Sequence, residues 1–349
     1  MQKTVGIPRA LYYFQYGPAW QRFFQELDYP VVLSSPTDGK LIEKGAMLSV
    51  EEACLPIKIL HGHVAQLCEK GVTYIFLPRL ISLLKGSFTC PKIAGAPEMI
   101  QSAFTQRPIL LSPSIRAGEN PLTACYELGR ELDRSASRVR KAWTVACENS
   151  GGPVEKRDPE ALRVALLGHP YLLYDSGANM RLREKLEDQK ILVCTPDEYD
   201  PEDLRERAAD MTEKRIFWST GEETVGYILA LLDNEPKPDG FIFVTSFGCG
   251  VDSFILNVGQ RLIQKKSQIP YLELSLDEHA GEAGFDTRIE AFIDMLERRR
   301  ERGKSAWQTH EHICHRLRAV GFPHHLVSGS HRPSCDAVGS GWLPCGRAG

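Results

Sequence analysis

Three cysteines lie in short segments rich in proline and glycine, and their residue type suits metal binding. Cys54 lies in Glu-Ala-Cys-Leu-Pro-Ile-Lys, Cys90 in Thr-Cys-Pro-Lys and Cys249 in Ser-Phe-Gly-Cys-Gly-Val-Asp-Ser. Each is expected to follow a strand or to open a helix, where the loops of an α/β fold converge on one crevice. In a reducing compartment, thiolates gathered there are metal ligands rather than disulfide partners. The three cysteines are therefore predicted to share one metal site.

The neighbours of these cysteines leave the type of metal open. A proline directly follows Cys90, a step common at iron–sulfur ligands, and glycines on both sides of Cys249 allow a bulky inorganic group to approach. The sequence contains no Cys-x-x-Cys pair, which excludes zinc ribbons and ferredoxin-type ligand runs. Three distant ligands suit either an iron–sulfur cubane with one open iron or a catalytic zinc ion with a water ligand. Three loop cysteines without a metal are the remaining alternative.

A polar loop offers candidates for catalysis. Asp277, Glu278 and His279 end a predicted strand and enter a glycine-containing loop, a place where polar side chains often serve a site. They are expected to supply a general acid or a hydrogen bond to the metal group. The alternative is a loop that only caps the next helix.

Further polar residues are expected in supporting roles. His61 and His63 lie two residues apart on a predicted helix, so their rings point in different directions and capping or supporting contacts are expected rather than paired ligation. Lys58 and Lys92 each closely follow a candidate cysteine, where they would neutralise an anionic group or remain at the surface. Loop residues at the expected mouth of the crevice are predicted to line a pocket between the halves or to close their interface: Arg9, Tyr12, Tyr13, Tyr171, Tyr174 and Asp175.

A weak internal repeat organises the elements that must position these residues. Val-Gly-Ile-Pro-Arg-Ala-Leu-Tyr-Tyr at 5–13 aligns with Leu-Gly-His-Pro-Tyr-Leu-Leu-Tyr-Asp at 167–175, so that Pro8 matches Pro170. Short β-branched strands that alternate with helices follow in each copy, a pattern typical of parallel βαβ units. We therefore predict an α/β fold class with two doubly wound Rossmann-like domains, parallel sheets and the metal site in the crevice between them. The strands predicted after the repeated segments span 29–33, 73–77, 190–194 and 240–245.

Two domains are predicted to divide most of the chain. Residues 1–150 form the first α/β domain, which holds two of the candidate cysteines and ends in a long connecting helix over 122–146. Residues 151–302 form the second α/β domain, which holds the third cysteine. The joint is expected within 149–160, where Ser-Gly-Gly-Pro and a run of charges interrupt helical periodicity.

The last segment, residues 303–349, has a different character. It is rich in His, Ser, Gly and Cys and lacks clear apolar periodicity. An irregular tail, disordered or altered by a change of reading frame, explains this composition better than a functional segment. Four of its residues superficially resemble a metal site: His310, His312, Cys314 and His315.

Bulk properties limit the classes of partner. The chain has 349 residues, a formal net charge of -3 and a pI near 6.4, so neither nucleic acid nor a membrane surface is expected as a partner. Apolar runs stay well short of the roughly 20 residues that a membrane span needs. No export segment is expected, which predicts a cytoplasmic location. The sequence has no phosphate-binding loop, dinucleotide fingerprint or Gly-x-Ser-x-Gly elbow. Four other cysteines are expected to pack as small hydrophobes: Cys68, Cys125, Cys147 and Cys194.

Taken together, these motifs resemble one known family. The chain is similar, over about residues 3–300, to the acyl-CoA dehydratase activase-related family. This family belongs to the superfamily of 2-hydroxyacyl-CoA dehydratase D-components, benzoyl-CoA reductase subunits and double-cubane cluster proteins. The resemblance rests on the repeated first segment, the three cysteine motifs and three further ones, namely Phe-Leu-Pro-Arg, Gly-His-Pro-Tyr and Asp-Glu-His-Ala-Gly-Glu-Ala-Gly.

The resemblance implies an oxygen-sensitive iron–sulfur cluster, of [4Fe-4S] or double-cubane type, held by Cys54, Cys90 and Cys249. It also implies a separate ATP-dependent activase that donates a low-potential electron, a dimer with a like or unlike subunit, and an acyl-CoA substrate. The chain lacks the activase's Asp-x-Gly-Ser-type phosphate loop, so it resembles the electron acceptor. The implied reaction is radical dehydration by a (R)-2-hydroxyacyl-CoA dehydratase-like lyase, or reduction by an ATP-dependent reductase component. A non-catalytic iron–sulfur accessory or electron-relay protein is the alternative, and whether the chain is an enzyme stays open.

Overall fold

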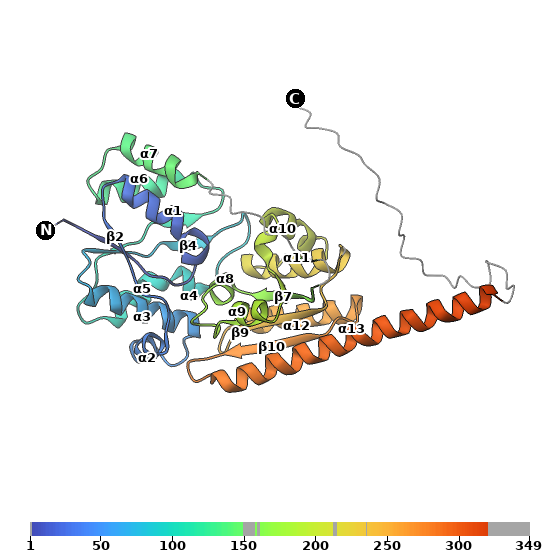
Figure 1. Cartoon of the computed structure of the whole chain (residues 1–349). Helices are drawn as coiled ribbons and strands as arrows, with labels where there is room; N and C mark the ends of the chain where they lie inside the picture. The colour runs from blue at the N-terminus through green and yellow to red at the C-terminus, as the bar shows by residue number, and fades with distance from the viewer. Residues whose placement is uncertain (1, 149–157, 159–160, 212–214, 235, 320–349) are drawn as a thin grey trace, which may run out of the picture. The chain divides into compact units, whose positions relative to one another are not determined.

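The protein contains two four-stranded parallel sheets (Figure 1). They lie within one compact unit that ends at Leu296, and a second unit begins at Glu297. The predicted α/β fold class with Rossmann-like parallel sheets is confirmed. The computed structural model describes residues 2–148, 158, 161–211, 215–234 and 236–319, with side chains described as far as residue 302.

The first sheet has the strand order β2-β1-β3-β5, and all its neighbouring strands are parallel. Parallel neighbours need crossover connections, and helices supply most of them here. The strands are β1 (Val5–Ile7), β2 (Val31–Leu33), β3 (Tyr74–Phe76) and β5 (Leu110–Leu111). The helices are α1 (Tyr13–Glu26), α2 (Gly39–Leu48), α3 (Leu55–Glu69), α4 (Pro91–Ala94), α5 (Ala96–Ala103), α6 (Pro121–Glu131) and α7 (Ala136–Cys147).

The second sheet has the order β10-β9-β7-β8 and is also parallel throughout. Its strand β9 is buried at every residue, as expected for the centre of a parallel sheet. The strands are β7 (Arg163–Gly168), β8 (Leu192–Cys194), β9 (Gly240–Ser246) and β10 (Tyr271–Leu276). The helices are α8 (Pro170–Leu173), α9 (Leu182–Asp188), the 3₁₀ helix η1 (Pro196–Glu198), α10 (Pro201–Ala209), α11 (Ser219–Asp233), α12 (Gly250–Lys266) and α13 (Glu282–Ala319).

Both sheets share one strand order, which supports the internal repeat. In each half the first strand lies between the second and the third, so the order reverses at β1/β3 and at β7/β9. Such a reversal opens a crevice at the carboxyl ends of the strands, where ligands of α/β proteins bind. His169 directly follows β7, and Cys249 follows β9 after two residues. The second sheet therefore delivers both residues to its own switch point.

One hydrophobic core continues from the first half into the second. It includes Ile57 and Leu60 of α3 together with Leu166 of β7 and Val244 of β9, each at most 1% exposed. A smaller core in the first half packs β1 against α1, α6 and α7. The shared core fixes the cysteine-bearing ends of the two sheets relative to each other.

An additional small sheet has one of its two strands between β3 and Cys90 in the sequence. Strands β4 (Arg79–Ser82) and β6 (Ser114–Arg116) pair in parallel outside the main sheet. The third strand of the sheet therefore passes directly into a cysteine loop only in the second half. In the first half the chain crosses β4 before it reaches Cys90.

The prediction of one long helix over 122–146 is wrong. The helices α6 and α7 replace it, and Asp133 between them has a φ of 54°, in the left-handed region that ends a helix. The predicted joint at 149–160 lies outside the described residues, except for Asp158. The helix α13 continues through residues 303–319 of the predicted irregular tail. The side chains of the four histidine and cysteine residues at 310–315 and everything from 320 onward lie outside the described part.

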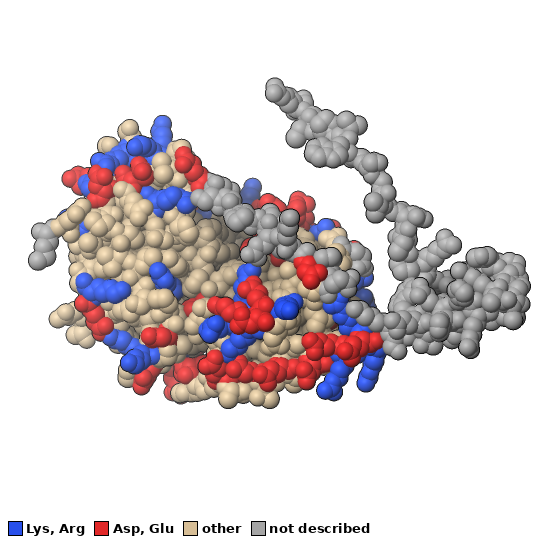
Figure 2. Space-filling model, viewed as in Figure 1, with Lys and Arg blue, Asp and Glu red and all other residues tan. Residues whose placement is uncertain are grey.

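Charged side chains of both signs are interspersed on the surface drawn in Figure 2. Lysine and arginine do not gather into one continuous patch on that face, in keeping with the small negative net charge of -3. Within the described residues, none of the helices combines the length and the apolar character needed to cross a membrane.

Candidate metal centre

Each of the three candidate cysteines is the N-cap residue of a helix. Cys54 precedes α3, Cys90 precedes α4 and Cys249 precedes α12. Proline in the first turn of α3 and of α4 favours a helix start there, because its φ is helical and it has no N–H to satisfy. The first N–H groups of a helix lack partners within it, and this end carries partial positive charge. Two of the sulfurs meet such N–H groups, because the Asp252 N–H donates to Cys249 at 3.4 Å and the Ile57 N–H to Cys54, and these contacts favour a thiolate.

Hydrogen bonds tie the three cysteine loops together. The backbone N–H of Leu55 donates to Ser246 Oγ at 3.0 Å, which joins the first cysteine loop to the third. Lys92 on α4 donates from Nζ to the Glu52 carbonyl at 2.9 Å, which joins the second loop to the first. Segments far apart in sequence thus form one region, which we call the cysteine site.

Cationic side chains support two of the buried thiols. Burial raises the pKa of the Cys54 thiol, and Lys92 opposes this shift. Burial also raises the pKa of Cys249, and a hydrogen bond from His169 opposes it. A buried thiol stays neutral unless a positive charge or a metal stabilises its thiolate. Both sulfurs therefore have a partner in place that favours the ionised form.

A buried histidine that was not predicted as a site residue, His169, lies beside Cys249. His169 Nε2 lies 2.8 Å from Asp252 Oδ1 and 3.8 Å from the Cys249 sulfur. Burial lowers the pKa of His169, but the Asp252 carboxylate and the sulfur outweigh it and raise the pKa to about 10. The ring is therefore protonated at neutral pH, and Nε2 donates between two acceptors.

His169, Cys249 and Asp252 also have the composition of a single-ion metal site. Their ligand atoms lie within 4.8 Å of one another, and zinc binds such side chains. Here, however, Nε2 carries the proton that binds Asp252 and would have to lose it to bind a metal. A nucleophilic Cys-His-Asp arrangement uses the two ring nitrogens for different partners, whereas one nitrogen serves both here. The geometry favours hydrogen-bonded support of Cys249 over a zinc site or a nucleophile.

Two tyrosine rings pack in sequence against the His169 imidazole. The Tyr171 ring stacks on the imidazole with centroids 4.8 Å apart, and the Tyr12 ring meets Tyr171 edge-on at 5.9 Å. Tyr12 is 1% exposed, and its hydroxyl has no hydrogen-bond partner among the described residues. Burial raises the pKa of Tyr12 far above its usual value, and the charges of Glu223 and Cys90 add to the shift. A buried hydroxyl left unpaired is costly, and the proton of this one is available to a group bound beside it.

The residues of the cysteine site fit an iron–sulfur group. Cys54, Cys90 and Cys249 are all free thiols, and thiolate is the ligand type that such groups use. The orphaned hydroxyl of Tyr12 lies within electrostatic reach of Cys90, so a group held by the thiols would meet a hydrogen-bond donor there. The three thiols would hold the group, and Tyr12 would face it.

A buried ion-pair network positions the Cys90 loop. Glu222, with a side chain 2% exposed, lies 2.7 Å from Arg215 Nε and 3.7 Å from Arg205 Nε. Both arginines also donate to the backbone carbonyl of Lys85, five residues before the cysteine. We call these three charged side chains the Glu222 clamp. It fixes a loop of the first half with residues of the second.

The polar loop lies beside α3. Glu278 forms an ion pair with Lys58, whose side chain is 5% exposed, and the hydrogen bond from Lys58 lowers the Glu278 pKa. Asp277 Oδ1 accepts the backbone N–H of His279 at 2.8 Å, while the His279 side chain is 87% exposed. The loop is thus anchored through Glu278 to the helix that begins at Cys54. Lys58 is buried rather than at the surface.

The two histidines of α3 make supporting contacts, as the sequence suggests. His61 Nδ1 lies 2.8 Å from the Ile57 carbonyl, one turn earlier. His63 Nε2 lies 3.0 Å from Thr37 Oγ1, and Thr37 donates to Asp175 Oδ2 at 2.7 Å. Burial lowers the pKa of His63 to about 3 and raises that of Asp175 to about 6. His63, Thr37 and Asp175 form a buried polar link between the two halves.

Several site residues could have been found from the sequence. His169 stands in the Gly-His-Pro-Tyr motif where the first copy of the repeat has Ile7, and a polar residue in place of an apolar one signals a role. Asp252 lies three residues after Cys249, at the usual place of an acidic residue in a first helical turn. Glu222 and Glu223 carried no comparable signal, because acidic residues near a helix start are common.

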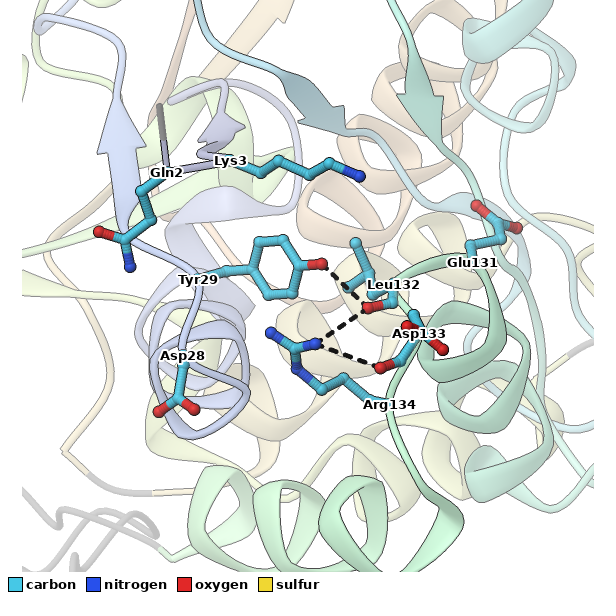
Figure 3. Close-up of a pocket in the computed structure, with 8 residues that line it drawn as sticks. All are labelled: Gln2, Lys3, Asp28, Tyr29, Glu131, Leu132, Asp133 and Arg134. Atoms are coloured by element: carbon cyan, nitrogen blue, oxygen red, sulfur yellow. Dashed lines mark hydrogen bonds between the residues drawn. The ribbon is translucent and has the colours of Figure 1, made fainter.

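A pocket of about 450 Å³ lies elsewhere, at the amino end of the first sheet (Figure 3). Tyr29 Oη donates to the Leu132 carbonyl at 2.9 Å, and the Arg134 guanidinium lies 4.8 Å from the centre of the Tyr29 ring. These contacts close the turn between α6 and α7 onto the start of β2. Ligands of α/β sheets bind at the opposite, carboxyl edge, so the position of this pocket does not indicate a ligand site. Its lining residues are Gln2, Lys3, Asp28, Tyr29, Glu131, Leu132, Asp133 and Arg134.

Comparison with known proteins gives two family matches. Residues 4–198 match a family described as CoA enzyme activase uncharacterised domain. Residues 148–296 match the family 2-hydroxyglutaryl-CoA dehydratase, D-component. No curated protein matches the chain. The first match spans more than half of the chain, and the two together run through both sheets and all three cysteine loops.

Proposed function

Because the chain belongs to the family of the CoA enzyme activase uncharacterised domain, we propose that it is the iron–sulfur component of a system of the 2-hydroxyacyl-CoA dehydratase type. The observation that carries the proposal is the cysteine site. Three thiols from distant segments cap three helices, and hydrogen bonds hold their loops together beside an orphaned buried hydroxyl.

The proposed ligands are Cys54, Cys90 and Cys249. An iron–sulfur cluster of [4Fe-4S] or double-cubane type, held by these thiolates, supplies low-potential electron transfer and Lewis-acid character. The helix N-termini and the Lys92 ammonium favour the negative charge of the thiolates. Burial of Cys54 and Cys249 keeps water away from their sulfurs, which strengthens electrostatic interactions there.

His169 keeps its proton at Nε2 through the pair with Asp252 and places positive charge beside the Cys249 sulfur. In a hydrogen-bonded ligand set, such a donor tunes the reduction potential of the metal group. The Glu222 clamp holds the loop of Cys90, a second proposed ligand, in position. These residues position and tune the site without binding substrate.

The proposed electron donor is an ATP-dependent activase, and the proposed substrate is an acyl-CoA thioester. The polar loop of Asp277, Glu278 and His279 is proposed to contribute a general acid or a substrate contact. Its anchor to Lys58 on α3 keeps it near the helix that carries the first ligand. The reaction would be dehydration of a 2-hydroxyacyl-CoA or a reduction, in a dimeric protein of the cytoplasm.

Anaerobic purification of the full chain tests the proposal. Iron and acid-labile sulfide are counted per chain, an EPR spectrum is recorded after reduction, and thermal shift is measured with (R)-2-hydroxyglutaryl-CoA. Bound iron and sulfide with a shift on thioester addition would support the proposal. Iron without thioester binding would indicate the electron-relay role instead. A colourless protein, with zinc or without metal, would overturn the iron–sulfur assignment.

A further inference from the structure

We propose that Glu223 and Tyr12 line one side of the cysteine site and act on the same substrate oxygen. Tyr12 donates a hydrogen bond to this oxygen, and Glu223 supplies a proton to it. The inference rests on the proposed function, because it names an acid for the reaction assigned to that site. It adds two residues from segments that neither the polar loop at 277–279 nor the three ligands occupy.

The Tyr12 hydroxyl is placed to meet a bound molecule. Tyr12 is the residue before α1, in the loop after β1, at the switch point of the first sheet. Its ring packs edge-on against Tyr171, which stacks on His169. Its hydroxyl is buried without a partner, within electrostatic reach of Cys90. A rigid hydroxyl with a free proton can donate to an oxygen that enters the site.

Glu223 lies on a helix of the second half whose start is bound to the Cys90 loop, one turn after the residue that makes the contact. This helix is α11, and the Ser219 N–H at its start donates to the Phe88 carbonyl at 3.0 Å. The Ser219 hydroxyl donates to the same carbonyl at 3.3 Å. The Glu223 side chain is half-buried and is not part of the Glu222 clamp. It is therefore a carboxyl near the ligand loops that no ion pair occupies among the described residues.

Four titratable groups lie close enough to the Glu223 carboxyl to interact with it electrostatically. Tyr12 and Tyr16 come from α1 and its cap, His169 precedes α8, and Glu222 is its neighbour on α11. Burial raises the pKa of Glu223 to about 7, with the His169 cation opposing the shift and Glu222 adding to it. The carboxyl is thus about half protonated near neutral pH, where a general acid is most effective.

The proposed step is a single proton transfer that accompanies loss of a hydroxyl from the substrate. The ATP-dependent activase of the proposed function supplies one electron to the acyl group of the substrate, where it stays as an unpaired electron when the hydroxyl leaves. The C–O bond breaks, and its electron pair stays with the departing oxygen. The O–H bond of Glu223 breaks, its proton joins that oxygen to give water, and the carboxylate keeps the electron pair. Tyr12 donates a hydrogen bond to the same oxygen and keeps its own proton.

The test compares Glu223→Gln and Tyr12→Phe with the wild-type chain after anaerobic loading. Iron and sulfide content and the midpoint potential are measured between about pH 6 and pH 8. Glu206→Gln, an exposed glutamate on α10, and Tyr126→Phe, a tyrosine on α6, are the matched controls. Binding of (R)-2-hydroxyglutaryl-CoA is measured for each variant by calorimetry.

Reduction adds negative charge and favours protonation of a nearby carboxyl, so the wild-type potential should fall as the pH rises, by at most 59 mV per pH unit for one electron. Glu223→Gln should load the same iron and lose this slope, while Tyr12→Phe should keep the slope and bind the thioester about tenfold more weakly. Both controls should match the wild type. If Glu223→Gln loads poorly, Glu223→Asp, which keeps a titrating carboxyl, should load and retain the slope.

A slope that persists in Glu223→Gln would overturn the assignment of the acid, and unchanged thioester affinity in Tyr12→Phe would overturn that of the oxygen-binding hydroxyl. Either result would leave the iron content of the wild type, and with it the proposed function, intact. A wild-type chain without iron would instead refute the proposed function itself, and this inference with it.

Discussion

The Nε2 atom of His169 lies 2.8 Å from Oδ1 of Asp252, and the pair joins the end of β7 to the first turn of α12. Asp252 Oδ2 also accepts the Ser246 N–H at 3.2 Å, and the Asp252 N–H points to the Cys249 sulfur at 3.4 Å. One carboxylate thus organises both strand ends at the switch point of the second sheet. The Cys249 loop is held by electrostatics as well as by packing.

Replacing Asp252 with Asn should lower the pKa of His169 well below about 10, because burial remains while the carboxylate charge is removed and only the Cys249 sulfur still raises the pKa. In the wild type, stability from this raised pKa is present below pH 6.5 and is lost as the pH rises toward about 10. The variant should lack this alkaline loss. An NMR titration of the metal-free protein and urea unfolding at several pH values measure both effects. An unchanged His169 titration would contradict the pairing.

The Glu222 clamp makes a prediction about the Cys90 loop. Glu222→Ala leaves Arg215 without its buried partner and Arg205 with only the exposed Glu202, and should destabilise the protein by about 2–4 kcal/mol, less than a fully buried pair because Arg215 is 41% exposed. The freed loop should also let iodoacetamide reach Cys90 faster. Asp233→Ala on the same helix is the control, since its two cationic partners are exposed and its removal should cost less than about 1 kcal/mol. Equal losses in the two variants would refute the clamp.

The buried link of His63, Thr37 and Asp175 predicts opposite acid responses in two variants. The lowered pKa of His63 means that stability is lost as the pH falls from 6.5 toward about 3, because only the unfolded chain takes up the proton. The raised pKa of Asp175 acts the other way, since the folded state binds a proton more readily between pH 6 and 3.8. His63→Gln should therefore reduce the loss of folding stability as the pH falls. Asp175→Asn should make this loss larger. Urea unfolding midpoints of both variants, measured from about pH 4 to pH 7, test this prediction. If both variants change the pH dependence of stability in the same direction, the opposite roles of His63 and Asp175 are contradicted.

Close packing of α2 on α3 makes a prediction about the helix that begins at Cys54. A Cβ on Gly62 would lie 2.3 Å from the Leu41 backbone carbonyl, so Gly62→Ala must push the helices apart. We expect a loss of about 1–3 kcal/mol from this overpacking. Gly39→Ala in α2 meets nothing within 4 Å and should be neutral or slightly stabilising. Thermal unfolding midpoints of both variants test this prediction. Equal midpoints would show that α2 and α3 accommodate the added methyl group without a loss of stability.

The sequence predicted the repeated architecture because local signals recur in both halves. Alternating short strands and helices, and the shared Pro8 and Pro170 positions, need no tertiary information. The placement of the cysteines at helix starts was predictable for the same reason, since proline and glycine act locally. These features are encoded within a few residues of one another.

The features that the sequence did not reveal depend on contacts between distant segments. The turn at Asp133 interrupts an otherwise helical pattern, because the chain folds back there to pack α7 on α1. The His169 pair and the Glu222 clamp join residues from separate elements, so no local pattern marks them. The polar loop was noticed for its composition, yet its anchoring partner, Lys58, lies 220 residues away.

The ligand assignment gives the last prediction. Replacing Cys54, Cys90 or Cys249 with Ser should each remove most of the bound iron, because three thiolates from three loops are all needed to hold one group. Cys68→Ser is the matched control, since Cys68 lies near the far end of the same helix α3 that Cys54 caps. Its thiol packs beside apolar residues and should leave the iron count unchanged.

Iron and sulfide counts under anaerobic conditions, with circular dichroism to verify folding, separate loss of a ligand from loss of structure. Cys249→Ser should be the most severe of the three, because it also deprives the protonated His169 of the sulfur toward which Nε2 points. If Cys68→Ser loses as much iron as the Cys54 variant, the assignment of Cys54 as the ligand at the start of α3 is contradicted. Retention of iron in all three ligand variants would leave His169, Cys249 and Asp252 without a role as support for a thiolate, and would remove the argument for the cysteine site.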